Sequence, residues 1–170
     1  MLETERLVIR PGTIADAQSL IELNLDPIVM RFTGDQRFNT VSEAADFIEQ
    51  IMVPQFDRFQ MGRFFVFKKD GSFIGWCGLK YFPDTDEVDL GYRFHQKYWS
   101  QGFATESARA MMDYGFEELK LDRIIAKAMP ENLASIKVLQ KLKMTFRGYQ
   151  HDPTDPHPFL LYEKIKAPRA

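Results

Sequence analysis

The sequence has little that would build a metal centre or a disulfide framework. Its single cysteine, Cys77, lies in an apolar run, so the chain has no second thiol for an internal disulfide or a thiolate metal site. The three histidines, His95, His151 and His157, show no i, i+4 spacing and no neighbouring cysteine, so they lack the usual zinc patterns. We therefore expect no metal and a core-packing role for Cys77.

Long apolar runs and basic runs are also absent. No apolar stretch approaches the roughly 20 residues that span a bilayer, and the N-terminal residues show no basic-then-apolar signal pattern. The 22 Lys and Arg residues against 24 Asp and Glu residues give a net charge of −2, which provides no general attraction to nucleic acid. These absences predict a cytoplasmic protein with neither membrane nor nucleic-acid partners.

The hydrophobic pattern predicts one mixed α/β (α+β) domain over residues 1–170. The chain contains 45% hydrophobic residues, enough for a full core, and no repeat or linker interrupts it. A Thr-x-x-Asp capping box at Thr13 starts the first helix, and an Asp-Gly turn at 70–71 joins two strands into a hairpin. The periodicities indicate strands at 6–10, 63–68, 73–82, 87–94, 123–128, 145–149 and 159–165, and helices at 14–25, 40–59, 103–121 and 130–142.

The most informative segment is YWSQGFATESARAMMDYGF at 98–116, a polar turn that runs directly into an amphipathic helix. Gly102 carries no side chain, so a ligand can approach the backbone closely. The free N–H groups from Gln101 to Thr105 would point outward at the helix N-terminus, where anions such as a pyrophosphate bind. The alternative interpretation is that Ser100 simply caps this helix.

Three motifs together resemble the GNAT superfamily of acyl-CoA-dependent N-acyltransferases. They are ETERLVIRP at 3–11, DLGYRFHQKYWSQGFATES at 89–107 and NLASIKVLQKLKM at 132–144. Their order and spacing are similar to the ribosomal-protein-alanine acetyltransferase, or RimJ/RimL-like, branch. The resemblance covers nearly the whole chain. It implies a GNAT fold, with a splayed central mixed sheet of about seven strands flanked by about four helices, and acetyl-CoA as the co-substrate.

The resemblance also implies where the coenzyme lies. The sheet would open between the strand ending at Phe94 and the strand at 123–128, and pantetheine would pair with the free strand edge there. The backbone contacts for pantetheine would come from Tyr92, Arg93 and Phe94, and those for the pyrophosphate from Gln101, Gly102, Phe103, Ala104 and Thr105. Asn132 would help to hold the same arm, although it also fits a plain N-cap, with Ser135 at the N3 position.

Two carboxylates are candidates for the base that accepts the amine's proton. In a strand at 87–94, Glu87, Asp89, Gly91 and Arg93 share one face. Asp89 occupies the position where similar sequences carry glutamate in Glu-Ile-Gly-Tyr, so the resemblance assigns it the proton, taken through water. Glu87 is the second candidate. The alternative is that both carboxylates form a solvated acidic edge.

The leaving thiolate needs a hydrogen-bond donor. Many superfamily members place a tyrosine seven residues after the asparagine, but this chain has Leu139 there. Ser135, one helical turn beyond Asn132, resembles the branch's hydroxyl donor to the coenzyme sulfur, although it also fits a simple helix-start serine. The backbone N–H near Phe94 is the expected donor to the oxyanion.

Two positions depart from the family pattern. Lys143 and Ser100 both stand where similar sequences carry glycine. A left-handed Lys143 would cost roughly 1 kcal/mol.

The acceptor is a primary amine whose identity the motifs leave open. An α-amine, with a pKa near 7.7 to 8.0, is easier to deprotonate than a lysine near 10.4, which favours a protein N-terminus. Arg31 and Arg37 would suit an acidic protein, whereas Asp84, Asp86, Glu87 and Asp89 would suit a small cationic amine. A third alternative is a non-catalytic acyl-CoA-binding module. Aromatic residues, 14% of the chain, suggest an exposed patch for a homodimer.

Overall fold

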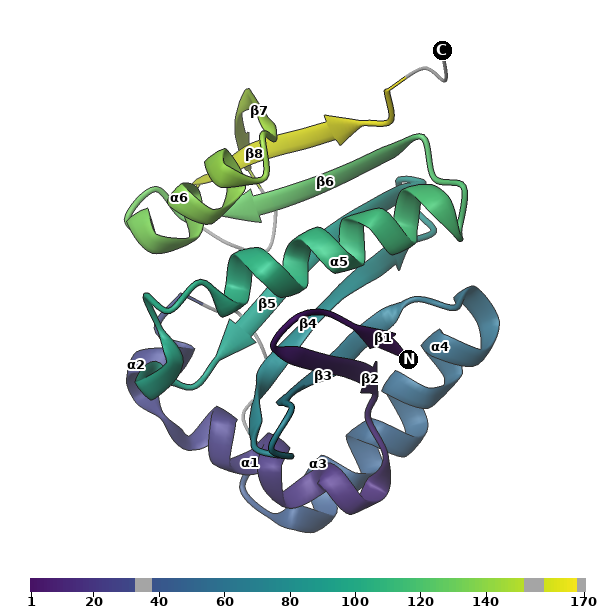
Figure 1. Cartoon of the computed structure of the whole chain (residues 1–170), viewed down its shortest axis with the longest axis vertical. Helices are drawn as coiled ribbons and strands as arrows, with labels where there is room; N and C mark the ends of the chain where they lie inside the picture. The colour runs from purple at the N-terminus through teal and green to yellow at the C-terminus, as the bar shows by residue number, and fades with distance from the viewer. Residues whose placement is uncertain (33–37, 152–157, 168–170) are drawn as a thin grey trace.

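The computed structural model describes residues 1–32, 38–151 and 158–167 and contains one mixed sheet with helices on both faces (Figure 1). The strand order is β1-β2-β3-β4-β5-β6-β8-β7. The strands are β1 (Leu2–Glu3), β2 (Leu7–Pro11), β3 (Gly62–Lys68), β4 (Phe73–Phe82), β5 (Glu87–Phe94), β6 (Arg123–Ala128), β7 (Thr145–His151) and β8 (Pro158–Ile165). The helices are α1 (Ala17–Leu25), α2 (Pro27–Met30), α3 (Val41–Phe47), α4 (Val53–Phe59), α5 (Phe103–Glu117) and α6 (Leu133–Lys141).

This architecture confirms the predicted mixed α/β fold and adds two short elements, β1 and α2. The sheet gains an eighth strand, β1, because Leu2 pairs with Ile9 of β2. The helix predicted at 40–59 consists of α3, a π-helical stretch over Ile48–Met52, and α4. A further short helix, α2, follows Asp26, whose carboxylate accepts the Ile28 N–H at 2.9 Å. The capping carboxylate predicted at the chain's first helix is present, since Thr13 N–H donates to Asp16 at 2.8 Å.

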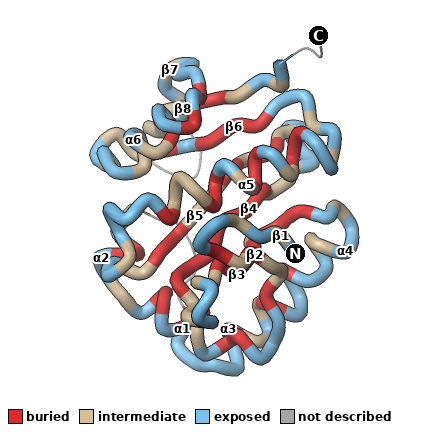
Figure 2. The backbone as a smooth tube through the Cα atoms, viewed as in Figure 1, coloured by how far each residue is buried: buried red, intermediate tan, exposed pale blue. Residues whose placement is uncertain are grey.

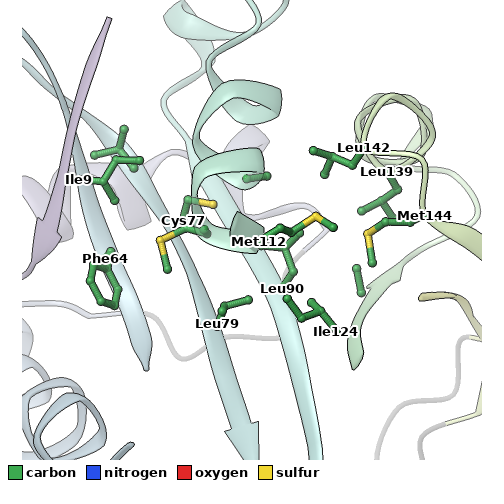
Figure 3. Close-up of a cluster of buried hydrophobic side chains, with 14 of the residues drawn as sticks. Ile9, Phe64, Cys77, Leu79, Leu90, Met112, Ile124, Leu139, Leu142 and Met144 are labelled. Carbon is green, nitrogen blue, oxygen red and sulfur yellow. The ribbon is translucent and has the colours of Figure 1, made fainter. Parts of the chain in front are cut away.

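Two hydrophobic clusters hold the layers together. One lies between the sheet and α5 and includes Cys77, Leu90 and Met112, which are labelled in Figure 3. The other packs α1 and α3 on the opposite face and includes Leu20 and Phe65. Figure 2 shows buried positions concentrated along the strands and on the inner side of α5. Cys77 is fully buried, and burial raises the pKa of its thiol to about 12, which confirms its core-packing role.

The sheet opens between β5 and β6. The antiparallel β4 and β5 pair along their whole length, from Phe82 with Glu87 to Gly75 with Phe94. In contrast, the parallel β5 and β6 share a single partner pair, Asp89 with Ile125. Beyond Asp89 the edge of β5 is therefore not paired with β6. This is the splay predicted between the two strands, and it divides the molecule into the β1–β5 part and the part formed by β6, β8, β7 and α6 (Figure 1).

Lys143 adopts the left-handed conformation expected from its position after α6, with φ of 57°. We expect Lys143→Gly to raise the free energy of unfolding by about 1 kcal/mol, because glycine adopts this conformation without a Cβ clash. Urea denaturation measures the change. Lys137→Gly, at an exposed position inside α6, is the matched control and should lower stability by about 1 kcal/mol. A loss of stability in Lys143→Gly would contradict the argument.

Candidate coenzyme and catalytic site

The free edge of β5 presents backbone groups to the opening. In an antiparallel ladder, the backbone N–H and C=O groups of successive residues point alternately toward the partner strand and away from it. His95 N–H donates to Ile74 at 3.0 Å, so alternation turns the backbone of Arg93 toward β4 and that of Tyr92 and Phe94 toward the opening. Trp99 Nε1–H donates to the Phe94 carbonyl at 2.7 Å. The Phe94 N–H thus stays directed toward the opening, as the oxyanion role requires.

Arg93 is placed differently from its two neighbours. Its buried side chain lies on the α1 face of the sheet, where Nη1 donates to Asn24 Oδ1 at 2.6 Å and contacts the Met30 sulfur at 3.3 Å. The guanidinium also lies 5.4 Å from the centre of the Trp76 ring. Arg93 therefore binds β5 to the α1 and α2 region, while the residues on either side of it supply the free edge.

The start of α5 has the geometry of an anion site. Gly102 is the N-cap residue, with φ of 85°, and it has no side chain to occupy the first-turn N–H groups of Phe103, Ala104 and Thr105. The interpretation of Ser100 as the helix cap is wrong, because Ser100 lies two residues earlier in a left-handed conformation, with φ of 61°. Gln101 donates its side-chain amide to the Lys97 carbonyl at 2.8 Å, which closes the turn. Exposed N–H groups at a helix start suit a pyrophosphate.

The N-terminal motif braces this turn. Glu106, in the first turn of α5, accepts the Thr4 hydroxyl at 2.6 Å and Arg6 Nε at 2.7 Å. Arg6 Nη1 also donates to the Gln101 carbonyl at 3.0 Å, and its guanidinium lies 4.4 Å from the centre of the Phe103 ring. A Cβ at Gly102 would lie 3.3 Å from Arg6 Nη2. The ETERLVIRP segment therefore holds the turn through side chains that the sequence did not connect.

Asp89 lies where β5 and β6 last touch. Its residue is half-buried, but Oδ1 is shut off from solvent and accepts no hydrogen bond within the described residues. Burial raises the pKa of the Asp89 carboxyl to about 7, against the opposing charges of Lys127 and Lys80, and Glu87 raises it further. Asp89 is therefore not part of a solvated acidic edge. A carboxyl that titrates near neutrality at an opening in the sheet fits a general base.

Glu87 is engaged in a chain of ion pairs. Its carboxylate accepts from Arg123 Nη1 at 3.3 Å, and Arg123 Nε donates to Glu163 at 2.8 Å. Glu163 also accepts from Arg147 at 2.5 Å. The two guanidinium groups hold the pKa of Glu163 below its ordinary value. Because Glu87 already pairs with a cation, it is the weaker of the two candidate bases.

Ser135 contacts Tyr92 across the opening, and Asn132 caps the start of α6 beside it. Asn132 Oδ1 accepts the Ser135 N–H at 3.0 Å, which confirms the N-cap interpretation of Asn132. The Ser135 hydroxyl lies 2.9 Å from the Tyr92 hydroxyl. Leu139 is buried in the core. The sequence motifs indicate only a backbone contact for Tyr92, although the two-residue period of β5 places its side chain on the same face as Leu90.

Of the residues predicted to contact the acceptor, Arg37 lies outside the described residues. A cavity of about 460 Å³ opens at the end of the sheet where β5 begins. It is lined by Phe59, Met61, Tyr81, Asp86, Glu87, Val88, Lys120, Leu121, Asp122, Arg123 and Ile125. Tyr81 donates its hydroxyl to Asp86 at its rim, at 2.9 Å.

Within residues 1–32, 38–151 and 158–167, no three His, Cys, Asp or Glu side chains gather closely enough to hold a metal ion. No helix in that part of the chain is long and apolar enough to cross a bilayer.

Comparisons with known proteins agree with this geometry. An uncharacterized N-acetyltransferase p20 from Bacillus licheniformis is 34% identical, over 97% of this chain and 88% of its own length. FsC-acetyl coenzyme A-N(2)-transacetylase from Aspergillus fumigatus is 33% identical, over 85% of this chain and 64% of its own. The crystal structure of RimL, the ribosomal L7/L12 alpha-N-protein acetyltransferase, in complex with coenzyme A superposes with a TM-score of 0.83 at 18% identity, covering 95% of each chain.

The opened sheet and the uncapped start of α5 fit an acyltransferase that uses coenzyme A. A family model for the acetyltransferase (GNAT) domain matches residues 6–145, and the chain belongs to that family. It is a GNAT-family N-acetyltransferase, and GNAT acetyltransferases use acetyl-CoA.

Proposed function

We propose that this enzyme transfers an acetyl group from acetyl-CoA to a primary amine by direct attack in a ternary complex, and that its acceptor is the N-terminal α-amine of a protein or peptide, as in the RimJ/RimL-like branch. The observation that carries the proposal is the Asp89 carboxyl at the opening between β5 and β6, whose Oδ1 is closed off from solvent and accepts no hydrogen bond within the described residues. Burial there raises the pKa of this carboxyl to about 7. This value lies just below the pKa of an α-amine and more than three units below that of a lysine.

The residues present fit the coenzyme. The first-turn N–H groups of α5, led by Gly102, suit a pyrophosphate. The backbone groups of Tyr92 and the Phe94 N–H, which face the opening, suit the amides of an extended pantetheine arm. Acetyl-CoA supplies a thioester whose carbon the amine attacks. We expect both contacts to be made through backbone, so they depend on the local conformation more than on side-chain identity.

Three groups of the chain serve the three steps. Asp89 accepts the proton that the amine loses, through a water molecule, because aspartate is one methylene shorter than the glutamate it replaces. The Phe94 N–H donates to the oxygen that becomes negative when the thioester carbon is attacked. The Ser135 hydroxyl donates to the departing sulfur, where negative charge collects last.

The release of free coenzyme thiol from acetyl-CoA tests the proposed acceptor. Peptides with a free Ala or Ser N-terminus should turn over faster than polyamines and aminoglycosides. The same peptides with an acetylated N-terminus are the matched control and should give only background release. No turnover with any amine, together with intact coenzyme binding, would favour the non-catalytic binding module instead.

A small cationic amine is the second candidate acceptor. The cavity at the start of β5 has Asp86, Glu87 and Asp122 in its lining, and these carboxylates attract an ammonium group. Lys120 and Arg123 also line it and reduce this attraction. Faster thiol release with polyamines than with peptides would decide for this candidate and leave the coenzyme assignment unchanged.

The brace between Arg6 and Glu106 gives a separate prediction about coenzyme affinity. We expect Arg6→Gln to weaken coenzyme A binding by roughly tenfold, because the variant loses an ion pair at 2.6 Å and a hydrogen bond to the turn that holds the pyrophosphate. Pantetheine, which lacks the pyrophosphate, should bind both proteins equally. Lys69→Gln removes the same charge and the exposed ion pair with Glu3 nearby, and should leave affinity within twofold. Equal losses for both ligands in Arg6→Gln would refute this role; calorimetry provides the affinities.

A further inference from the structure

We propose that Tyr92 is a positioning residue for the acetyl transfer, which aims the Ser135 hydroxyl at the coenzyme sulfur from across the opening of the sheet. The inference rests on the proposed function for the role of Ser135, and it adds a residue for which the sequence motifs indicate only a backbone contact.

The first observation is where the two hydroxyl groups come from. Tyr92 projects from β5 and Ser135 from the first turn of α6, so they come from opposite sides of the opening, and 43 positions separate them in sequence. Their oxygens lie 2.9 Å apart, within ordinary O–H···O distance. The last backbone pair between β5 and β6 is at Asp89, three residues earlier. The Tyr92–Ser135 contact therefore links the two sides beyond the point where the backbone ladder ends.

The second observation is how the protons can be arranged. A tyrosine and a serine hydroxyl each have one proton and can also accept. If Tyr92 donates to the Ser135 carbonyl, at 3.3 Å, the serine proton points back at Tyr92. If Tyr92 donates to Ser135 Oγ, at 2.9 Å, the serine proton is released for another acceptor. A thiolate beside Ser135 selects the second arrangement, because hydrogen bonds to ionised acceptors are the stronger ones.

The third observation indicates that Tyr92 orients and polarises the Ser135 hydroxyl and does not give up its own proton. Burial raises the pKa of its hydroxyl above the ordinary value near 10, although the hydrogen bond with Ser135 acts in the opposite direction. A thiolate, with a pKa near 8.5 for an ordinary thiol, is too weak a base to take that proton. Tyr92 therefore keeps its proton throughout. By donating to Ser135 Oγ it strengthens the donation from Ser135 to sulfur, as successive hydrogen bonds polarise one another.

The backbone of Ser135 contributes to the same alignment. Asn132 Oδ1 fixes the Ser135 N–H at 3.0 Å, so the start of α6 cannot rotate freely. When Asn132 holds the main chain and Tyr92 donates to the hydroxyl oxygen, the serine proton points away from Tyr92. The Asn132 cap and the Tyr92 contact thus place one donor at the opening, and a serine can act there where many relatives use a tyrosine.

The test is the ionisation of the coenzyme thiol in its complex with the enzyme. Coenzyme A labelled with carbon-13 on the methylene next to sulfur reports its own thiol pKa by NMR, without signals from protein tyrosines. We expect the bound thiol to have a lower pKa than the free coenzyme. Ser135→Ala and Tyr92→Phe should each raise it by about one unit, the effect of one lost hydrogen bond to a charged group. The double variant should add little, because both changes break one chain of donors.

Tyr114→Phe is the matched control. It removes a tyrosine hydroxyl that donates to the Gln60 carbonyl at 2.9 Å, and it should leave the bound thiol unchanged. In activity assays Tyr92→Phe should lower kcat with little change in the KM for acetyl-CoA. An unchanged thiol pKa in Tyr92→Phe that still binds coenzyme overturns the proposal. If that variant fails to fold, an unchanged thiol pKa in Ser135→Ala overturns it equally.

The two proposals fail separately. If no amine is acetylated but both variants raise the bound thiol pKa, the acceptor assignment is wrong and the Tyr92 role holds. If peptides are acetylated and Ser135→Ala shifts the thiol pKa while Tyr92→Phe does not, the proposed function holds with its Ser135 donor and the role of Tyr92 is refuted.

Discussion

Asp89→Asn is expected to lower kcat/KM by about 10²- to 10³-fold, within the range that positioned general bases contribute. Asparagine has nearly the same shape and keeps the β5 pairing with Lys80 and Ile125. It cannot accept a proton, however, so the amine must lose its proton to bulk water. The effect should appear with every amine that the enzyme accepts, because Asp89 acts before the thioester bond breaks.

The pH profile identifies Asp89 more specifically. Only its deprotonated form is a base, so wild-type activity should rise as the pH passes through about 7, where this carboxyl ionises. In Asp89→Asn that rise should disappear, and only the dependence on the amine's own pKa should remain. Rates of thiol release between pH 5.5 and 9, at saturating acetyl-CoA, measure both curves.

Glu87→Gln is the control for Asp89→Asn. Glu87 already pairs with Arg123 at 3.3 Å, so its loss should reduce activity by less than about tenfold. A larger loss in Glu87→Gln than in Asp89→Asn would transfer the role of base to Glu87. If neither variant loses activity, the enzyme relies on positioning the substrates and needs no side-chain base.

The raised pKa of Asp89 also affects how the free energy of unfolding changes with pH. The change has the opposite sign from that of an ordinary aspartate, whose pKa is lowered by folding. The folded-state pKa lies above the unfolded value near 3.9, so between those two values the folded protein holds more protons. The free energy of unfolding should therefore decrease as the pH rises from about 4 to 7 through this group. Asp89→Asn should show a shallower decrease, and chemical denaturation at a series of pH values tests it.

Gly78→Ala is expected to cause the largest loss of stability among the substitutions considered. A Cβ at this position would lie 1.8 Å from the Gly62 carbonyl oxygen and 3.0 Å from Arg63 Cα, both backbone atoms of the neighbouring β3. No side-chain rotation relieves such a contact, so β3 and β4 must separate in the centre of the sheet. We expect a loss of about 3 kcal/mol or more, which corresponds to a fall in Tm of roughly 6 to 12 °C.

Gly71→Ala separates crowding from backbone strain. Gly71 has φ of 86°, and a Cβ there would meet nothing within 4 Å. Its replacement should cost only about 1 kcal/mol, the price of a left-handed alanine. Calorimetry on both variants provides the comparison. If Gly78→Ala is no less stable than Gly71→Ala, the close approach of β3 and β4 is not a constraint on the fold.

The sequence predicted well wherever interactions are local. The order of strands and helices follows from hydrophobic period, and the Asp16 contact at Thr13 follows from a three-residue spacing. Gly102 as the entry to α5 and the left-handed Lys143 were likewise readable from turn chemistry. The interpretation of Ser100 as a cap failed because the chain continues through two more residues before α5 begins.

By itself, the sequence determined the order of strands and helices and the burial of Cys77, because hydrophobic period and local motifs encode these. Its resemblance to the GNAT family indicated the opening after β5 and Asp89 as the candidate base. Only the tertiary structure decided which polar groups meet. Arg6 and Glu106 are 100 positions apart, Tyr92 and Ser135 are 43 apart, and Glu87 and Arg123 are 36 apart. Such pairs depend on how the sheet twists and how α5 and α6 cross it. The raised pKa of Asp89 has the same origin, since its main cause is burial by neighbouring strands.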